Sequence, residues 1–168
     1  MSKIEIAIDD LTYAEILIIN KASLLANFKF FINNISLSDS DVEGDLGILC
    51  SNFETFLCNI DNFIDKTFWN KENHQIIKEF IHFRSKQAEC DWDDVESNIF
   101  NDIFFKCLLP FNSEFMDQNV LIGYIENDIL YIKKWNYFLP DDIIDIKIEI
   151  NKIKRILSEI INVIYKIK

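Results

Sequence analysis

The sequence predicts an all-α fold, a single-domain bundle of five or six helices that spans residues 1–168 and ends in a long Ile-rich helix. Three observations lead to this expectation. Apolar residues recur at spacings of three and four along most of the chain, which is the period of an amphipathic helix. The chain has only three Gly and two Pro, the residues that are common at the turns of turn-rich folds. Its 168 residues, 49% of them apolar, suffice for one domain with a sizeable core and are too few for two.

The N-terminal part is expected to be a short extended segment followed by a long helix. Ile4, Ile6 and Ile8 occupy alternate positions, which is a strand signal. One short strand cannot form a sheet, so this segment is either a strand or an extended lead-in. From residue 10 to residue 34 the apolar positions step by three and four, which predicts the first helix.

Three further helices are expected in the middle of the chain. Residues 36–47 are rich in Ser, Asp and Gly and predict a loop. Apolar stripes then predict helices over 46–68, 76–88 and 95–108. The last of these ends before Pro110, because proline lacks the N–H that would continue the helix.

The C-terminal third is expected to hold a helix over 120–135 and a longer one after Pro140. The long helix carries a heptad seam. Its members step by three and four: Ile143, Ile146, Ile150, Ile153, Leu157, Ile160, Ile164 and Ile167. Alternation from Ile144 to Ile150 offers a competing strand interpretation of residues 142–150. The helix is favoured because the seam continues past Ile150.

Charge and hydropathy set the expected environment and class of partner. The chain carries 28 Asp and Glu against 17 Lys and Arg, a net charge of −11. Nucleic acid would repel this charge, so no nucleic-acid partner is expected. No stretch of 18 apolar residues predicts a membrane span, and the N-terminus has no signal-peptide pattern. A cytoplasmic location and no membrane partner are therefore expected.

The cysteines and histidines give no pattern of a metal or redox site. Cys50, Cys58, Cys90 and Cys107 form no Cys-x-x-Cys pair, and we expect them to be reduced core residues. Glu79-x-x-His82 matches half of a di-iron bundle signature, but His74, the other histidine, has Lys71 three residues before it. We expect two partly exposed histidines and no cofactor.

Residues 39–50 resemble an EF-hand calcium loop in part. Oxygen-bearing side chains stand at loop positions 1, 3 and 5, and Gly44 stands at position 6. Position 12 is Cys50, and a thiol cannot replace the bidentate Glu that calcium requires there. The pattern therefore favours an acidic loop that caps the next helix, through Asp41 or Asp45.

No enzyme signature is present in the sequence. The chain lacks a Gly-rich phosphate loop and the Gly-x-Ser-x-Gly elbow. With two Arg and two His, most acid–base and phosphoryl-transfer sites are hard to build. The protein is not expected to be an enzyme.

Acidic residues concentrate before the last helix and suggest a binding surface. The densest block, residues 89–102, has six acids and no base around Trp92. Carboxylates around an aromatic residue suit a basic protein partner, although acids also favour helix N-termini. The candidate partner-binding residues are Asp91, Trp92, Asp93, Asp94 and Glu96, and then Asp39, Asp41, Glu43 and Asp45.

These observations predict an acidic inhibitor, an immunity or antitoxin protein that covers the active surface of a basic, nuclease-like toxin domain. The chain is expected to be a monomer or a weak homodimer. The first alternative is a structural or regulatory helical subunit that oligomerises through the Ile143–Ile167 seam. The second is a protein with a carboxylate metal site, which nothing in the sequence locates.

Overall fold

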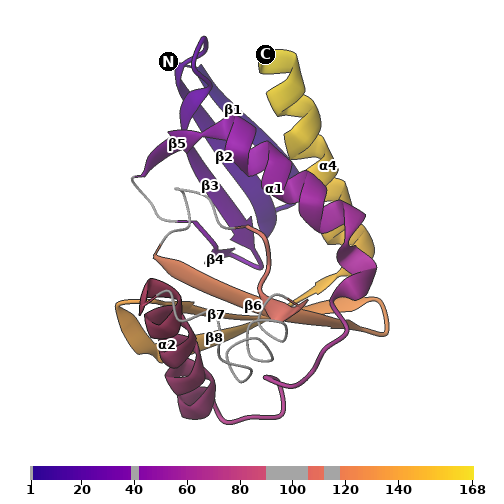
Figure 1. Ribbon diagram of the computed structural model, residues 1–168. Coiled ribbons are helices and arrows are strands. Elements are labelled where there is room, and N and C mark those ends of the chain that lie inside the picture. The colour runs from indigo at the N-terminus through magenta and orange to yellow at the C-terminus, as the bar shows by residue number, and fades with distance from the viewer. Residues whose placement is uncertain (1, 39–41, 90–105, 112–117) are drawn as a thin grey trace.

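The computed structural model describes residues 2–38, 42–89, 106–111 and 118–168 (Figure 1). Within these residues the chain forms two antiparallel β-sheets and three α-helices. The prediction of an all-α helical bundle is therefore wrong, and the fold is of the mixed α+β type. None of the helices in the described ranges is long and apolar enough to cross a membrane.

The first sheet, sheet A, is built by the N-terminal part of the chain. Its strand order is β1–β2–β3–β4, and β5 pairs with β3 as well. The strands are β1 (Ser2–Asp9), β2 (Thr12–Asn20), β3 (Leu25–Ile32), β4 (Ile35–Ser36) and β5 (Glu43–Asp45). The strand interpretation of residues 4–8 is thus confirmed.

The second sheet, sheet B, has the strand order β6–β7–β8. Its strands are β6 (Asn119–Glu126), β7 (Ile129–Asn136) and β8 (Leu139–Glu149). The helices are α1 (Leu46–Cys58), α2 (Asn73–Glu89) and α4 (Ile150–Ile167), and a short 3-10 turn, η1 (Ile60–Asn62), follows α1.

The helix expected over 10–34 is wrong, and these residues form the β2–β3 hairpin. Ala14 and Ile16 on β2 and Phe28 and Phe30 on β3 are buried, whereas the residues between them are only half-buried. A step of four residues returns to the same face in a strand as well as in a helix. Steps of four therefore did not discriminate between the two structures.

The helix expected over 120–135 is also wrong, because this segment forms the β6–β7 hairpin. Glu126 pairs with Ile129, so only Asn127 and Asp128 connect the strands. Both have positive φ, 51° and 62°. Two residues in the left-handed region give the turn whose twist matches antiparallel strands, and Asn and Asp tolerate it best after Gly.

The long C-terminal helix begins at Ile150 rather than Ile143. The competing strand interpretation holds for residues 142–149, which belong to β8. The heptad seam is not available for oligomerisation, because it faces the interior: Ile153, Leu157, Ile160 and Ile164 are fully buried. The structural-subunit alternative that relied on the Ile143–Ile167 seam is therefore wrong.

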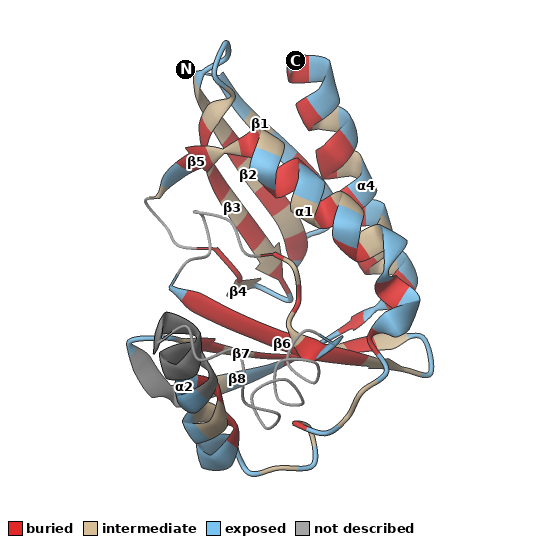
Figure 2. Cartoon of the chain, in the orientation of Figure 1, coloured by how far each residue is buried: buried red, intermediate tan, exposed pale blue. Residues whose placement is uncertain are grey.

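Helices α1 and α4 pack on one face of sheet A and enclose the main core with it (Figures 1 and 2). One face of sheet B, which includes Leu121, Leu130 and Ile132, contributes to the same core. Helix α2 packs on the other face of sheet B. A smaller core forms there, in which Phe80 of α2 packs against Trp135 of β7. Strand β6 therefore has buried residues on both faces.

The other helix predictions have mixed outcomes. The expected helix over 46–68 begins at Leu46 as predicted but ends at Cys58. The helix expected over 76–88 is confirmed and lies within α2. Most of the helix expected over 95–108 falls outside the described residues.

Candidate partner-binding groove

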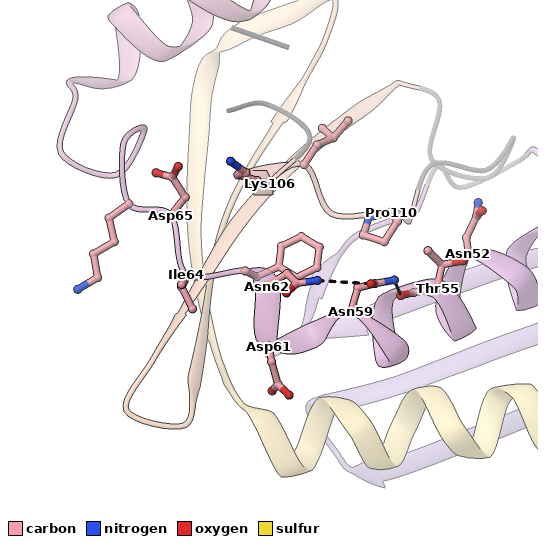
Figure 3. Close-up of a pocket in the computed structure, with 12 residues that line it drawn as sticks. Asn52, Thr55, Asn59, Asp61, Asn62, Ile64, Asp65, Lys106 and Pro110 are labelled. Atoms are coloured by element: carbon pink, nitrogen blue, oxygen red, sulfur yellow. Dashed lines mark hydrogen bonds between the residues drawn. The ribbon is translucent and has the colours of Figure 1, made fainter. Parts of the chain in front are cut away.

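A groove with a volume of about 1130 Å³ opens where α1, sheet B and the segment between them meet (Figure 3). Three stretches of chain line it: the C-terminal half of α1, residues 59–66 and residues 106–110. Its lining residues are Asn52, Thr55, Asn59, Asp61, Asn62, Phe63, Ile64, Asp65, Lys66, Lys106, Leu108 and Pro110.

One wall of the groove is a row of amide side chains at the end of α1. The Asn59 N–H donates to Thr55 O and Phe56 O, which closes the helix. Asn59 Nδ2 donates to Thr55 O at 2.8 Å, and Asn62 Nδ2 lies 3.4 Å from Asn59 Oδ1 (Figure 3). These bonds fix the amide groups along η1, so their positions are set before any partner arrives.

Two adjacent apolar residues on this wall point in opposite directions. Phe63 is 5% exposed and packs against Phe56, with ring centroids 5.3 Å apart. Ile64 is 69% exposed. The chain places Phe63 in the main core and thereby turns Ile64 outward, where it offers an apolar contact at the edge of the groove.

The two walls of the groove, residues 59–66 and residues 106–110, both attach to the edge of β6 that does not pair with β7. Ile125 N–H donates to Phe63 O on one side, and Leu109 N–H donates to Leu121 O at 2.9 Å on the other. Leu108 also forms a bridge with Ile122. The groove is therefore held by backbone hydrogen bonds to the edge strand β6, although its walls lie some 45 residues apart in sequence.

The charged groups in the groove have both signs. Asp61 is exposed, and Asp65 Oδ1 accepts a hydrogen bond from Thr67 N–H at 2.8 Å. Lys66 pairs with Glu126, and this hydrogen bond raises the pKa of Lys66 and keeps its ammonium charged. Because Lys66 is paired with a carboxylate outside the groove, the other charged groups that line the groove are Asp61, Asp65 and Lys106.

A buried thiol lies behind this wall. Cys107 Sγ donates to Asp65 O at 3.5 Å. Burial raises the pKa of the Cys107 thiol to about 12, with a smaller contribution from the Asp65 carboxylate. The thiol is therefore neutral and inert at neutral pH, and its role is packing.

Lys66 connects the groove to an aromatic cluster at sheet B. This cluster consists of Trp69, Tyr124 and Tyr131. The Tyr124 and Tyr131 rings stack with centroids 4.8 Å apart and planes at 7°, and Trp69 meets the Tyr124 ring edge-on at 4.8 Å. Lys66 Nζ lies 5.3 Å from the centroid of the Tyr124 ring. Cation–π contacts of this kind stabilise the position of the lysine.

The predicted site residues fall largely elsewhere. Asp91, Trp92, Asp93, Asp94 and Glu96 lie outside the described residues, and so do Asp39 and Asp41. Glu43 is exposed on β5. Asp45 is the N-cap of α1 and accepts from Gly47 N–H, so the prediction that this loop caps the next helix is confirmed.

The other candidate ligands are dispersed. His74 and His82 are both exposed, as predicted. Cys50 and Cys107 are buried, as predicted, but Cys58 is exposed and Cys90 lies outside the described residues. Within the described ranges, no three His, Cys, Asp or Glu side chains come together in a group that could hold a metal ion.

Sequence reasoning missed the groove. Its polar residues follow the point where the apolar stripe of α1 ends, in the stretch Asn59 to Asn62. The sequence pattern predicts this stretch as part of a helix over 46–68. A polar interruption inside a predicted apolar stripe was the available signal.

Comparison with known proteins gives one informative similarity. No protein-family model matches the chain, and no curated protein matches it in sequence. The fold is similar to the crystal structure of CdiI from Burkholderia dolosa AUO158, with a TM-score of 0.60 and 11% sequence identity. The similarity covers 90% of this chain and 94% of that one. The two proteins therefore share a fold over nearly their whole lengths.

Proposed function

We propose that this protein is an immunity-type inhibitor, which binds a toxin domain and blocks its active surface. The observation that carries the proposal is the shared fold with CdiI, an immunity protein, over nearly the full length of both chains. The proposal needs only a stable surface that fits a partner, and it asks for no cofactor.

Charge supports a basic toxin as the partner. The chain has a net charge of −11. A toxin that acts on nucleic acid needs a basic surface for the phosphates. An acidic inhibitor is attracted to that surface, associates with it faster and covers the groups that would bind the substrate.

The groove is the part of the described surface that best fits a protein contact. It combines an exposed apolar side chain, Ile64, with fixed amide donors and acceptors at Asn59 and Asn62. Asp61 and Asp65 add negative charge beside them. An apolar anchor surrounded by polar groups is the composition of an interface hot spot.

The acidic segments predicted from sequence complete the proposed interface. In the sequence Asp91, Asp93, Asp94 and Glu96 flank Trp92, a residue type enriched in hot spots. Asp39, Asp41 and Glu43 form a second acidic segment before α1. We propose that these carboxylates provide the attraction to the toxin, while the groove provides the specific contacts.

The binding experiment uses the product of the adjacent gene as the toxin candidate. Ile64→Asp and Asp61→Lys alter the groove, and Asp93→Lys with Asp94→Lys alters the first acidic segment. Leu11→Asp and Asp10→Lys are matched controls, because both residues are exposed in the β1–β2 turn. Each groove variant is expected to weaken binding by roughly 30-fold, the scale of one hot-spot residue, and the controls by much less.

Salt separates the two contributions. Raising the ionic strength is expected to slow association of the wild type and to have less effect on the double-lysine variant. Equal loss of binding in groove variants and controls would show that the groove is not the contact. Absence of any complex between the two wild-type proteins would contradict the proposed function.

A further inference from the structure

Strand β1 is the edge strand of sheet A. In the part of the chain that the structure describes, β1 pairs with β2 alone, whereas β2 and β3 have partners on both sides. The strand has eight residues and contains no Pro. Its outer edge therefore presents a row of backbone N–H and C=O groups that another strand can pair with.

The core-facing side chains of β1 are incompletely covered at this edge. Ile6 is 6% exposed, but Ile4 and Ile8 on either side of it are only half-buried. Ile16, the cross-strand partner of Ile4 on β2, is fully buried. The exposed parts of Ile4 and Ile8 are therefore explained by the free edge, and an added strand would cover them.

The charges of β1 do not protect the edge. Natural edge strands are often blunted by lysines or inward-pointing charges. Lys3 is the lysine of β1, and its Nζ is bonded to Glu15 Oε1 on β2 at 2.7 Å. This ion pair holds the Lys3 side chain over the outer face of sheet A, which leaves the backbone edge accessible.

We propose that β1 pairs antiparallel with β1 of a second copy of this chain, with the two-fold axis at Ile6. In this register Ile6 faces Ile6, Ile4 faces Ile8, and Glu5 faces Ala7. Each copy then covers the half-buried isoleucines of the other. The two sheets A become one continuous sheet across the dimer.

Alternative registers are disfavoured by charge or by length. An axis at Glu5 would place the two Glu5 carboxylates directly opposite each other, and an axis at Ala7 would place Glu5 opposite Asp9. Like charges in directly opposed positions destabilise a strand pair. An axis at Ile4 avoids this repulsion but pairs only residues 2–6. The axis at Ile6 pairs residues 3–9 without a like-charge contact, and this segment includes the irregular register of β1 between Ala7 and Asp9.

Ala7 provides a pair of matched variants, because its side chain is exposed and lies opposite Glu5 in the proposed dimer. Ala7→Glu creates two symmetry-related Glu–Glu contacts, and Ala7→Lys creates two Glu–Lys contacts. Sedimentation equilibrium of the full chain measures the dimer dissociation constant for each. We expect the wild type to show concentration-dependent dimerisation. Relative to it, Ala7→Glu should weaken the dimer about two- to thirty-fold and Ala7→Lys should tighten it by a similar factor.

Hydrogen exchange of the N-terminal peptide locates the contact. Amides of β1 are expected to exchange more slowly at high protein concentration in the wild type, and this difference is expected to shrink in Ala7→Glu. Circular dichroism checks that both variants keep the fold. A chain that stays monomeric at the highest concentration, or a dimer that responds equally to both substitutions, would overturn the proposal. None of the described residues that line the groove belongs to β1, so the outcome of this experiment is distinguishable from that of the toxin-binding experiment.

Discussion

The ammonium group of Lys133 lies 4.8 Å from the centroid of the Trp69 ring, although Lys133 is a strand residue that is only 6% exposed. The same nitrogen bonds to Asp145 Oδ1 at 2.8 Å and to Asn73 Oδ1 at 3.2 Å. One buried charge on β7 thereby contacts β8, the start of α2 and the loop that carries Trp69. This loop follows the groove wall directly, so Lys133 helps to position that wall.

Removing the carboxylate partner of Lys133 is expected to cost more than removing Lys133 itself. Asp145→Ala leaves a buried ammonium without its counter-ion, and we expect a loss of about 1–2 kcal/mol, because the Asp145 side chain is exposed and water screens the pair. Lys133→Met removes the charge and keeps a similar volume, so a change below about 1 kcal/mol is expected. Urea unfolding measures both. A larger loss in Lys133→Met would contradict this account of the pair.

Phe63 and Ile64 are adjacent in sequence but are expected to differ sharply in their effect on stability. Phe63→Ala removes a buried ring that packs on Phe56 and should cost about 3–5 kcal/mol. Ile64→Ala changes an exposed side chain and should stay within about 0.5 kcal/mol. Thermal unfolding of the two variants checks this. Comparable losses would mean that Ile64 is packed and not available to a partner.

Gly123 is expected to be intolerant of any side chain. A Cβ there would lie 2.9 Å from Tyr131 O on the paired strand and 3.1 Å from Leu109 Cδ2. Because Tyr131 O is backbone, Gly123→Ala must separate β6 from β7 or displace the 106–110 wall, at a cost of about 1–3 kcal/mol.

Gly47→Ala is the comparison for that variant. The added Cβ would meet Asp45 Oδ1, the end of a short side chain, and Ala favours the helix, so the net change should stay within about 1 kcal/mol. Denaturant midpoints of the two variants give the contrast. Unchanged stability in Gly123→Ala would contradict the close packing around β6.

The buried Cys107 thiol makes stability fall at alkaline pH. Burial raises the pKa of this thiol from 9.0 to about 12, so the folded protein keeps a proton that the unfolded chain releases. The contribution of Cys107 is therefore complete below about pH 9 and is lost as the pH rises toward 12.

Unfolding free energies between pH 8 and pH 10 test this linkage. The difference in stability between wild type and Cys107→Ala should shrink as the pH rises, because the variant has no thiol to titrate there. Cys58→Ala removes an exposed thiol and is the control for the substitution itself. A difference that stays constant or grows across this range would show that Cys107 is not shielded as described.

The sequence predicted helices well where the spacing excluded a strand. In α2 the adjacent apolar pairs Ile76–Ile77 and Phe80–Ile81 recur every four residues, which a half-buried strand cannot accommodate on one face. In β2 and β3 apolar residues also recur four positions apart, as in Ala14 and Ile18 or Phe28 and Ile32, and both structures satisfy that spacing. In the segment that forms β6 and β7, the dipeptide Asn127–Asp128 was a local signal for a hairpin, because Asn and Asp tolerate the left-handed region that both residues adopt.

The candidate site was predictable only where it depended on local sequence. Asp45 caps α1 because a carboxylate before an apolar stripe satisfies the free N–H groups of the first turn. The groove depends instead on how residues 59–66 and 106–110 both attach to β6. That arrangement is set by tertiary hydrogen bonds between segments far apart in the chain, which no spacing pattern encodes.

The most direct test of the proposed immunity function is a calorimetric titration of the adjacent gene's product with the purified chain, accompanied by co-expression of the two proteins. We expect saturation at one chain per toxin domain, weaker binding at high salt, and growth of cells that the toxin alone would stop. No heat of binding, together with undiminished toxicity in the presence of the chain, would contradict the account.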